Sequence, residues 1–188
     1  MPDREQIIKR LKSTLDSERF GHSLRVEKIA LALGKKWRVD QQKIIPAALL
    51  HDCGRRYDRP GLLRQARKLG LTIDRIRKFE PKLFHAEISA RLARTEFKVR
   101  SSEVLCAIRH HTVGAPKMSK LDQIIYLADH LEAGRNFAGV RTLRALAFKD
   151  LDRAVFESTS SMLKHLLSEK LPIYPGTVET RNYFITRL

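Results

Sequence analysis

The chain has 188 residues, 43% of them hydrophobic and 31% charged, which suits one soluble globular domain large enough to bury its own core. Two cysteines, Cys53 and Cys106, are too few for a disulfide framework, and no segment is apolar enough for a secretory signal or a membrane span, so we expect a cytoplasmic protein. The net charge of +16 predicts a polyanionic partner: nucleic acid, acidic lipid or a nucleotide polyphosphate.

Helical periodicity dominates the first half of the chain. Asp40 is placed to cap one helix that contains Pro46, and Pro81 is expected to precede another. A loop is predicted at Pro60-Gly61. The predicted helices of this half are 3–16, 18–38, 40–51, a series of short basic helices ending near residue 78, and 83–96.

The second half is also predicted to be helical, and Ser101 and Ser119 each begin a helix there. The predicted helices span 101–111, 119–133, 140–147 and 150–168, with a last one after the proline-bounded loop LPIYPGT. No alternating strand pattern, internal repeat or low-complexity linker occurs in the sequence. The sequence therefore predicts an all-α fold, in a single domain over residues 1–188.

Five of these helices carry a histidine or an aspartate on an apolar face. These side chains are His22, His51, Asp52, His85, His111 and Asp129. A single histidine on such a face is usually a core residue with a local hydrogen bond, but the backbone cannot cheaply satisfy the whole set. Because neutral imidazole and carboxylate together bind Fe, Mn, Co, Ni or Zn, the pattern predicts a metal site.

A strongly basic stretch follows the His51-Asp52 pair directly. Between Cys53 and Lys82 there are ten basic residues and three acidic ones, an excess of seven positive charges. Such runs are usually solvated helical faces. The position of this one beside the pair also allows a basic wall next to a binding site.

The order of these histidines and aspartates resembles the HD-domain phosphohydrolase superfamily, whose helices hold metal through an H…HD…D pattern. Within it, the chain resembles the YqeK family in five segments from Gly21 to Phe184: GHSLRVEKIALALGKKWRVD, AALLHDCGR, KLFHAEISARLA, AIRHHTVGAPKMSKLDQIIYLADHLEAGRNF and IYPGTVETRNYF. The resemblance implies an HD-domain helical bundle that hydrolyses diadenosine tetraphosphate symmetrically into two ADP.

The resemblance also implies a dinuclear centre, with two divalent ions that would be iron, although Mn or Co would suit the same ligands. Asp52 is assigned as the catalytic bridge because it has two carboxylate oxygens and a central place in the motif. His22, His51 and Asp129 would complete one metal site, and His85 and His111 the other. A hydroxide bridging the metals would be the nucleophile. The metal motifs thus lie between residues 22 and 129, and helices over 140–188 would pack on them.

Phosphate binding also requires cations that do not titrate, and arginine matches phosphate oxygens with a planar fork. Arg55, three residues after Asp52, is the first candidate for this catalytic role, followed by Arg109 and Arg135. For each arginine, a surface position or a salt bridge is the alternative. Thr112 and Gly114 could contribute a hydroxyl and a backbone N–H to the same phosphates.

Two other functions compatible with the sequence are kept as alternatives. The protein could be an HD phosphohydrolase acting on another nucleotide polyphosphate. It could also be a basic RNA- or ribosome-binding protein, although aromatic residues are only 7% and no nucleic-acid-binding signature occurs. The sequence does not fix the oligomeric state, and a homodimer is compatible with it.

Overall fold

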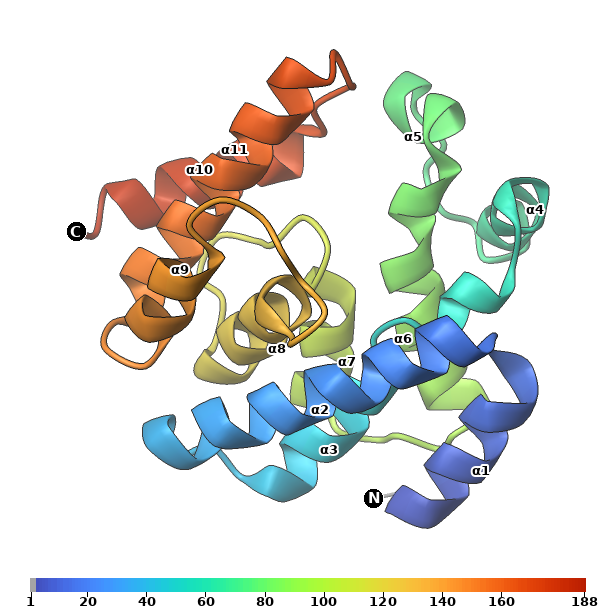
Figure 1. Ribbon diagram of the computed structural model, residues 1–188. Helices are drawn as coiled ribbons and strands as arrows, with labels where there is room; N and C mark the ends of the chain where they lie inside the picture. The colour runs from blue at the N-terminus through green and yellow to red at the C-terminus, as the bar shows by residue number, and fades with distance from the viewer. Residues whose placement is uncertain (1–2) are drawn as a thin grey trace.

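Helices form the whole secondary structure of the described part of the chain, residues 3–188, in a computed structural model (Figure 1). No strand occurs among these residues, so the predicted all-α fold is confirmed. No helix within them is both long and apolar enough to cross a membrane. The first helices are α1 (Arg4–Thr14), α2 (Ser17–Trp37), α3 (Gln41–Leu50), the 3-10 turn η1 (Cys53–Arg56), α4 (Arg59–Lys68) and α5 (Arg75–Phe79).

The remaining helices follow the predicted order. They are the 3-10 turn η2 (Pro81–Phe84), α6 (His85–Thr95), α7 (Ser102–His110), α8 (Lys120–Leu131), α9 (Val140–Ala147), α10 (Leu151–Ser168) and α11 (Pro175–Ile185). Polar side chains set several of the starts: Asp40 accepts from the Gln42 N–H at 2.8 Å, and Ser119 forms a reciprocal capping box with Asp122.

The prediction of a loop at Pro60-Gly61 is wrong, because both residues lie in the first turn of α4. Asp58 caps that helix by accepting a hydrogen bond from the Gly61 N–H at 2.7 Å. Proline fits the first turn of a helix, where its missing N–H would have had no partner. The other difference is at Pro81, which begins η2 before α6 starts at His85.

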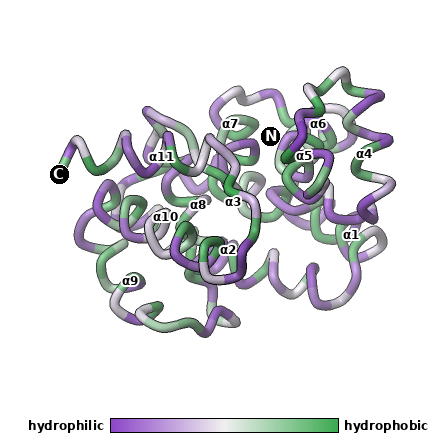
Figure 2. Tube along the Cα trace, turned by 90° about the horizontal axis from the view of Figure 1, so that it is seen from above, coloured by the Kyte–Doolittle hydropathy of each residue, from purple (hydrophilic) through white to green (hydrophobic). Residues whose placement is uncertain are grey.

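The core lies around α3 and α8, whose apolar side chains are almost all inaccessible to water. Figure 2 shows hydrophobic and hydrophilic stretches alternating along the helices, as expected for amphipathic helices that share one core. Pro46 lies inside α3 without ending it.

The packing of α3 and α8 brings distant motifs together. Helix α2 packs along both α3 and α8, and α7 packs on the same two helices (Figure 1). Helix α6 packs on α7 and on η1. Helix α10 packs on α8, α9 and α11, so the C-terminal helices attach to the core through α8 and α10. The predicted metal-binding residues lie on α2, α6 and α8, at the ends of α3 and α7, and directly before η1.

Candidate metal centre

The six side chains predicted to bind metal meet at one place. His22 lies within α2 and His85 begins α6. His51 and His111 are the C-cap residues of α3 and α7, and Asp129 lies near the end of α8. The structure thus brings together residues separated by up to 107 positions in the chain.

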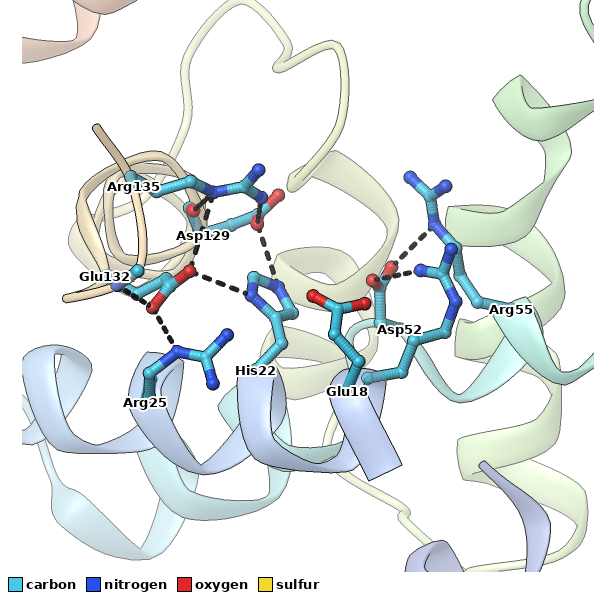
Figure 3. A pocket seen from close by; sticks show the side chains of 10 residues that line it. Glu18, His22, Arg25, Asp52, Arg55, Asp129, Glu132 and Arg135 are labelled. Atoms are coloured by element: carbon cyan, nitrogen blue, oxygen red, sulfur yellow. Dashed lines mark hydrogen bonds and ion pairs between the residues drawn. The ribbon is translucent and has the colours of Figure 1, made fainter. Parts of the chain in front are cut away.

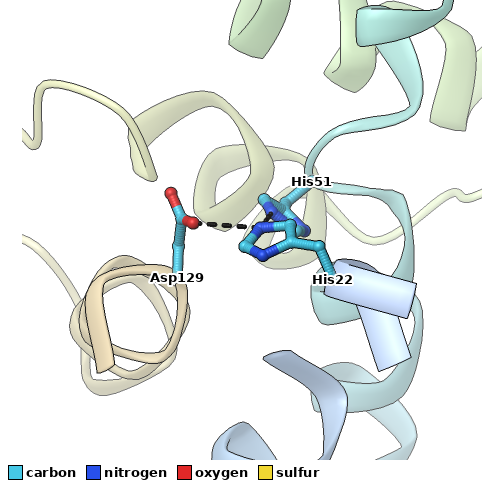
Figure 4. A group of neighbouring side chains, drawn as sticks. All are labelled: His22, His51 and Asp129. Carbon is cyan, nitrogen blue, oxygen red and sulfur yellow. Dashed lines mark hydrogen bonds and ion pairs between the residues drawn. The ribbon is translucent and has the colours of Figure 1, made fainter. Parts of the chain in front are cut away.

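His22, His51 and Asp129 form the first group of potential ligands (Figure 4). The Nε2 atom of His22 lies 3.2 Å from Nε2 of His51 and 3.1 Å from a carboxylate oxygen of Asp129. Figure 4 shows the three side chains pointing toward one another from three separate segments. Two imidazoles and one carboxylate are a common ligand set for a catalytic divalent metal.

Asp52, His85 and His111 form the second part of the centre. One oxygen of Asp52, Oδ1, lies 3.1 Å from Nε2 of His85 and 3.5 Å from Nε2 of His111. The other oxygen, Oδ2, lies 3.9 Å from Nε2 of His51. The Asp52 carboxylate therefore stands between the two groups of histidines, with one oxygen directed at each.

Backbone hydrogen bonds fix how three of these imidazoles are oriented. Nδ1 of His51 donates to the Ala48 carbonyl at 2.7 Å, and Nδ1 of His111 donates to the Ile108 carbonyl at 2.7 Å. His85 makes the same bond, to the carbonyl of Lys82. Because a carbonyl oxygen can only accept, each Nδ1 carries the hydrogen and each neutral ring points an Nε2 lone pair into the centre.

The imidazole nitrogens and the carboxylate of the centre are arranged as a metal cation requires. Nε2 of His85 and Nε2 of His111 lie 2.9 Å apart with lone pairs facing each other, beside a carboxylate oxygen of Asp52. The Thr112 hydroxyl is 3.1 and 3.2 Å from the same nitrogens, but it has only one hydrogen to give. Lone pairs and a carboxylate this close repel one another unless a cation lies among them.

Glu132, which the sequence reasoning missed, orients the remaining histidine (Figure 3). It is buried, and its Oε1 lies 3.4 Å from Nδ1 of His22. Its Oε2 accepts from Nε of Arg25 at 2.6 Å and from the Gly134 N–H at 2.6 Å. A carboxylate on the outer nitrogen of a ligating histidine is a usual arrangement in metal sites. Glu132 follows Asp129 by three residues, the spacing of one helix face, and this signal could have identified it.

Burial and charge set the protonation of the centre. Complete burial lowers the pKa of His51 to about 4, although the charge of Asp52 opposes the change. For Asp52 itself, burial favours the neutral acid, but the adjacent histidines outweigh it and hold the pKa well below its usual range. Burial likewise opposes protonation of His22, and the hydrogen bond and charge of Asp129 outweigh it, so the pKa of His22 is raised. Neutral imidazoles and ionised carboxylates are the forms that bind metal.

Gly54 allows η1 to carry Asp52 close to α6. Its N–H donates to the Ser89 hydroxyl at 2.8 Å, and a Cβ placed on it would lie 2.7 Å from the carbonyl oxygen of His85. No real side chain atom fits at that distance. The glycine that follows the His51-Asp52 pair is therefore required for the second group of ligands to assemble.

Two of the predicted arginines lie at the centre, and so does Thr112. Arg55 donates from Nε to Asp52 at 3.2 Å. Arg135 donates to the Asp129 carboxylate at 2.7 Å and to the Asp129 carbonyl at 3.0 Å. Both guanidinium groups are still partly exposed, so each has N–H groups free to meet a ligand. The Thr112 hydroxyl lies against His85 and His111.

The structure does not bring Arg109 and Gly114 to the centre in the expected way. Arg109 is an exposed residue in the last turn of α7 and lines neither of the two pockets at the centre. The Gly114 N–H, which was expected to reach a phosphate, donates to the His110 carbonyl at 2.9 Å. Gly114 has φ +73°, and a Cβ there would lie 2.5 Å from Thr180, so its role is to turn the chain beneath α11.

A charged pocket of about 310 Å³ opens beside these residues (Figure 3). Four arginines line it, Arg19, Arg25, Arg55 and Arg135, together with the acids Glu18 and Glu132 and three of the potential ligands. Arg19 and Arg25 were not predicted, although each lies three residues from His22 and thus near its helix face.

Several basic residues between Cys53 and Lys82 form ion pairs with glutamates instead of lining the centre. Arg56 pairs with Glu96 at 2.6 Å, Arg59 with Glu80 at 3.0 Å and Arg77 with Glu87 at 3.2 Å. Of the ten basic residues in the stretch, Arg55 and Lys82 line the pockets at the centre. The stretch is therefore mainly a paired and solvated face, and two of its members reach the site.

The chain belongs to the HD domain family, whose sequence pattern it matches over residues 19–134. That range contains all six potential ligands and Glu132. It is therefore a hydrolase of the HD superfamily, as the ordered motifs predicted, with a cluster of histidines and aspartates suited to divalent metal.

Within that family the chain is similar to the YqeK-like proteins. It is 35% identical to the symmetrical bis(5'-nucleosyl)-tetraphosphatase of Halalkalibacterium halodurans, over 97% of both chains. It is 30% identical to the protein of the same name from Bacillus subtilis, over 98% of both. Its fold matches the crystal structure of an HD superfamily hydrolase from Clostridium acetobutylicum, described as involved in NAD metabolism, with a TM-score of 0.95, 32% identity and complete coverage of both chains.

Proposed function

We propose that this protein is a metal-dependent hydrolase that cleaves diadenosine tetraphosphate symmetrically into two ADP. The observation that carries the proposal is the convergence of four imidazole Nε2 atoms and two carboxylates in one buried centre. The names of the relatives, which match over nearly the whole chain, support the choice of substrate.

We propose that two divalent cations bind at this centre, iron by resemblance, with Mn or Co as chemical equivalents. His22, His51 and Asp129 would hold one, and His85 and His111 the other. Asp52 would offer one carboxylate oxygen to each. When bound, such cations supply hydroxide at neutral pH and offset the negative charge of phosphoryl oxygens.

The protein's own groups would position the polyphosphate. Arg55 and Arg135 lie on opposite sides of the centre, each tied by one part of its guanidinium group to a ligand carboxylate. Their remaining N–H groups would bind phosphate oxygens in the forked geometry that arginine favours. Because the Asp52 and Asp129 carboxylates already hold the two arginines in place, little ordering of side chains would be needed when the polyphosphate binds.

Product analysis tests this function. The metal-loaded protein, purified anaerobically, is incubated with diadenosine tetraphosphate, and the products are separated by ion-exchange chromatography. ADP as the sole product is expected, and Asp52→Asn should abolish its formation while circular dichroism stays that of the native protein. AMP with ATP would contradict symmetrical cleavage, and no turnover by protein with confirmed bound metal would contradict the substrate.

Hydrolysis of a different nucleotide polyphosphate is the second candidate. The potential metal ligands and the arginines would meet only metal and phosphate, and they would not by themselves select a base. A panel of nucleotides that differ from diadenosine tetraphosphate in base or in the length of the phosphate chain, compared by kcat/KM, separates the two candidates. The proposed substrate should exceed these others by at least about tenfold, because a base and its phosphate chain are both matched only in the proposed substrate.

A further inference from the structure

Two pockets open on the candidate metal centre, and their walls differ in chemistry. The charged pocket has a volume of about 310 Å³, and a second one, the mixed pocket, has about 740 Å³. The two share Arg55, Asp129 and Arg135, so they meet at the place where the phosphates would bind. A ligand bound at the centre can therefore extend into both.

The charged pocket has no apolar wall against which a nucleobase could pack. Apart from Gly134, every residue that lines it is charged or titratable, and no aliphatic side chain, phenylalanine, tyrosine or tryptophan is among them. Arg25 and Arg135 are 37% and 43% exposed there, so their charge is available to an anion. This pocket has the chemistry to bind phosphate groups.

The mixed pocket combines an apolar wall with hydroxyl and imidazole groups. Its apolar lining includes Leu83, Val113, Phe137, Met162, Leu166 and Tyr174. The polar groups include His130, whose Nδ1 lies 2.6 Å from the Ser158 hydroxyl. Its volume is within the range of roughly 300–1,000 Å³ that is usual for small-molecule sites.

Two aromatic residues in this wall offer faces to a base. Phe137 lines the pocket and is 38% exposed, so its ring is accessible to a ligand. Tyr174 is held by Arg77, whose guanidinium carbon lies 4.8 Å from the centre of its ring. A base stacked on such rings buries apolar surface while its edge reaches the polar groups.

We propose that the enzyme holds one nucleoside of its substrate in the mixed pocket, on Phe137 and Tyr174, and only phosphate groups in the charged pocket. The proposal rests on the proposed function and adds that the two halves of a symmetrical substrate are bound unequally. The second nucleoside projects beyond the charged pocket toward solvent. One nucleoside with its phosphate chain therefore contains nearly all that the site recognises.

Binding of ADP and of inorganic pyrophosphate to the metal-loaded protein, measured by calorimetry, tests the aromatic wall. Phe137→Ala should weaken ADP binding by about 5-fold or more, the effect of losing one base–aromatic stack, and leave pyrophosphate binding within about twofold. Tyr174→Ala provides a second variant with the same expectation. Phe79→Ala removes a phenylalanine that is 64% exposed and lines neither pocket, and it should change neither affinity. Equal ADP affinity in wild type, Phe137→Ala and Tyr174→Ala would overturn the proposal, as would equal losses for ADP and pyrophosphate.

Hydrolysis of adenosine 5'-tetraphosphate tests whether the two halves of the substrate are bound unequally. Addition of water should give ADP and pyrophosphate, with a KM within about threefold of that for diadenosine tetraphosphate. A KM more than tenfold higher would mean that the second nucleoside is also bound, and it would overturn the proposal. If neither nucleotide is hydrolysed, the proposed function fails, while the binding measurements still decide where a nucleoside is held.

Discussion

The histidines of the candidate metal centre are oriented by groups that contact the ring nitrogen facing away from the centre. Three of them donate from Nδ1 to the carbonyl of the residue three positions earlier, namely Ala48, Lys82 or Ile108. His22 differs, because its outer nitrogen faces the Glu132 carboxylate instead. Local helix geometry thus fixes three ligands, and a single long-range contact fixes the fourth.

Glu132→Gln should therefore weaken metal binding through His22. Loss of an outer partner of a ligating histidine typically lowers metal affinity by about 10- to 100-fold, and we expect a loss in that range. Metal content after dialysis against graded chelator concentrations, read by elemental analysis, measures it. Glu103→Gln, which removes a carboxylate paired with Lys43 on the surface, is the matched control and should keep its metal. Retention of as much metal by Glu132→Gln as by the parent at every chelator concentration would show that Glu132 does not orient His22.

At the scale of elements, the centre depends on how closely η1 approaches α6. Asp52 precedes η1, His85 begins α6, and the contact between the two elements leaves no room for a side chain on Gly54. The same closeness brings a carboxylate oxygen of Asp52 to 3.1 Å from His85. A small separation of the two elements would therefore open the second group of ligands.

Gly54→Ala should push these elements apart. A methyl group forced against backbone costs about 1–3 kcal/mol, so the free energy of unfolding in urea should fall by about that much and metal content should fall with it. Gly21→Ala is the control, because it places the same methyl group in α2 beside His22, where the nearest atom is the flexible end of Arg25 at 3.2 Å. That variant should be as stable as the parent or slightly more so. Unchanged stability and metal content in Gly54→Ala would contradict the close-packing argument.

At the scale of the whole molecule, the metal-free centre lowers the free energy of unfolding, because folding buries several titratable groups there. His51 and His85 both have their pKa lowered, mainly by burial. A bound cation would offset this cost, because metal binding to the folded state alone stabilises it by mass action.

Acid should destabilise the metal-free protein between about pH 6.5 and pH 4. The unfolded chain protonates His51 near 6.5, whereas the folded chain does so only near 4, so the full stability is present above pH 6.5 and falls as the pH drops. This one group contributes about 3 kcal/mol, and His85 acts in the same direction. The raised pKa of His22 opposes part of the loss. Urea unfolding of metal-free protein at pH 7.5, 6 and 5 should show midpoints that fall in that order, and constant or rising midpoints would contradict the argument.

Added divalent metal should raise the thermal midpoint of the chelator-treated protein at pH 7.5. At a metal concentration 100 times the dissociation constant the gain is about 2.7 kcal/mol. Differential scanning calorimetry with Mn²⁺ measures it, and a double variant lacking both His22 and His85 should show no gain. A thermal midpoint that Mn²⁺ leaves unchanged would mean that the folded centre does not bind it.

The sequence by itself determined the helices and the identity of the groups that gather at the centre. Helix starts follow from short-range capping by residues such as Asp40 and Ser119, and the inward faces of His22, His85 and His111 follow from spacing along one helix. The error at Pro60-Gly61 arose because proline and glycine suit a loop and the first turn of a helix equally well.

Only the tertiary structure decided which neighbours share the site. Glu132, Arg19 and Arg25 line the charged pocket, and Arg109 is exposed on the surface. The Gly114 N–H donates a hydrogen bond to the carbonyl of His110. The tertiary structure also brought Phe137 and Tyr174 into the lining of one pocket. The physical reason is that periodicity fixes the direction of a side chain about its own helix axis, whereas the partner across a pocket depends on how separate helices pack.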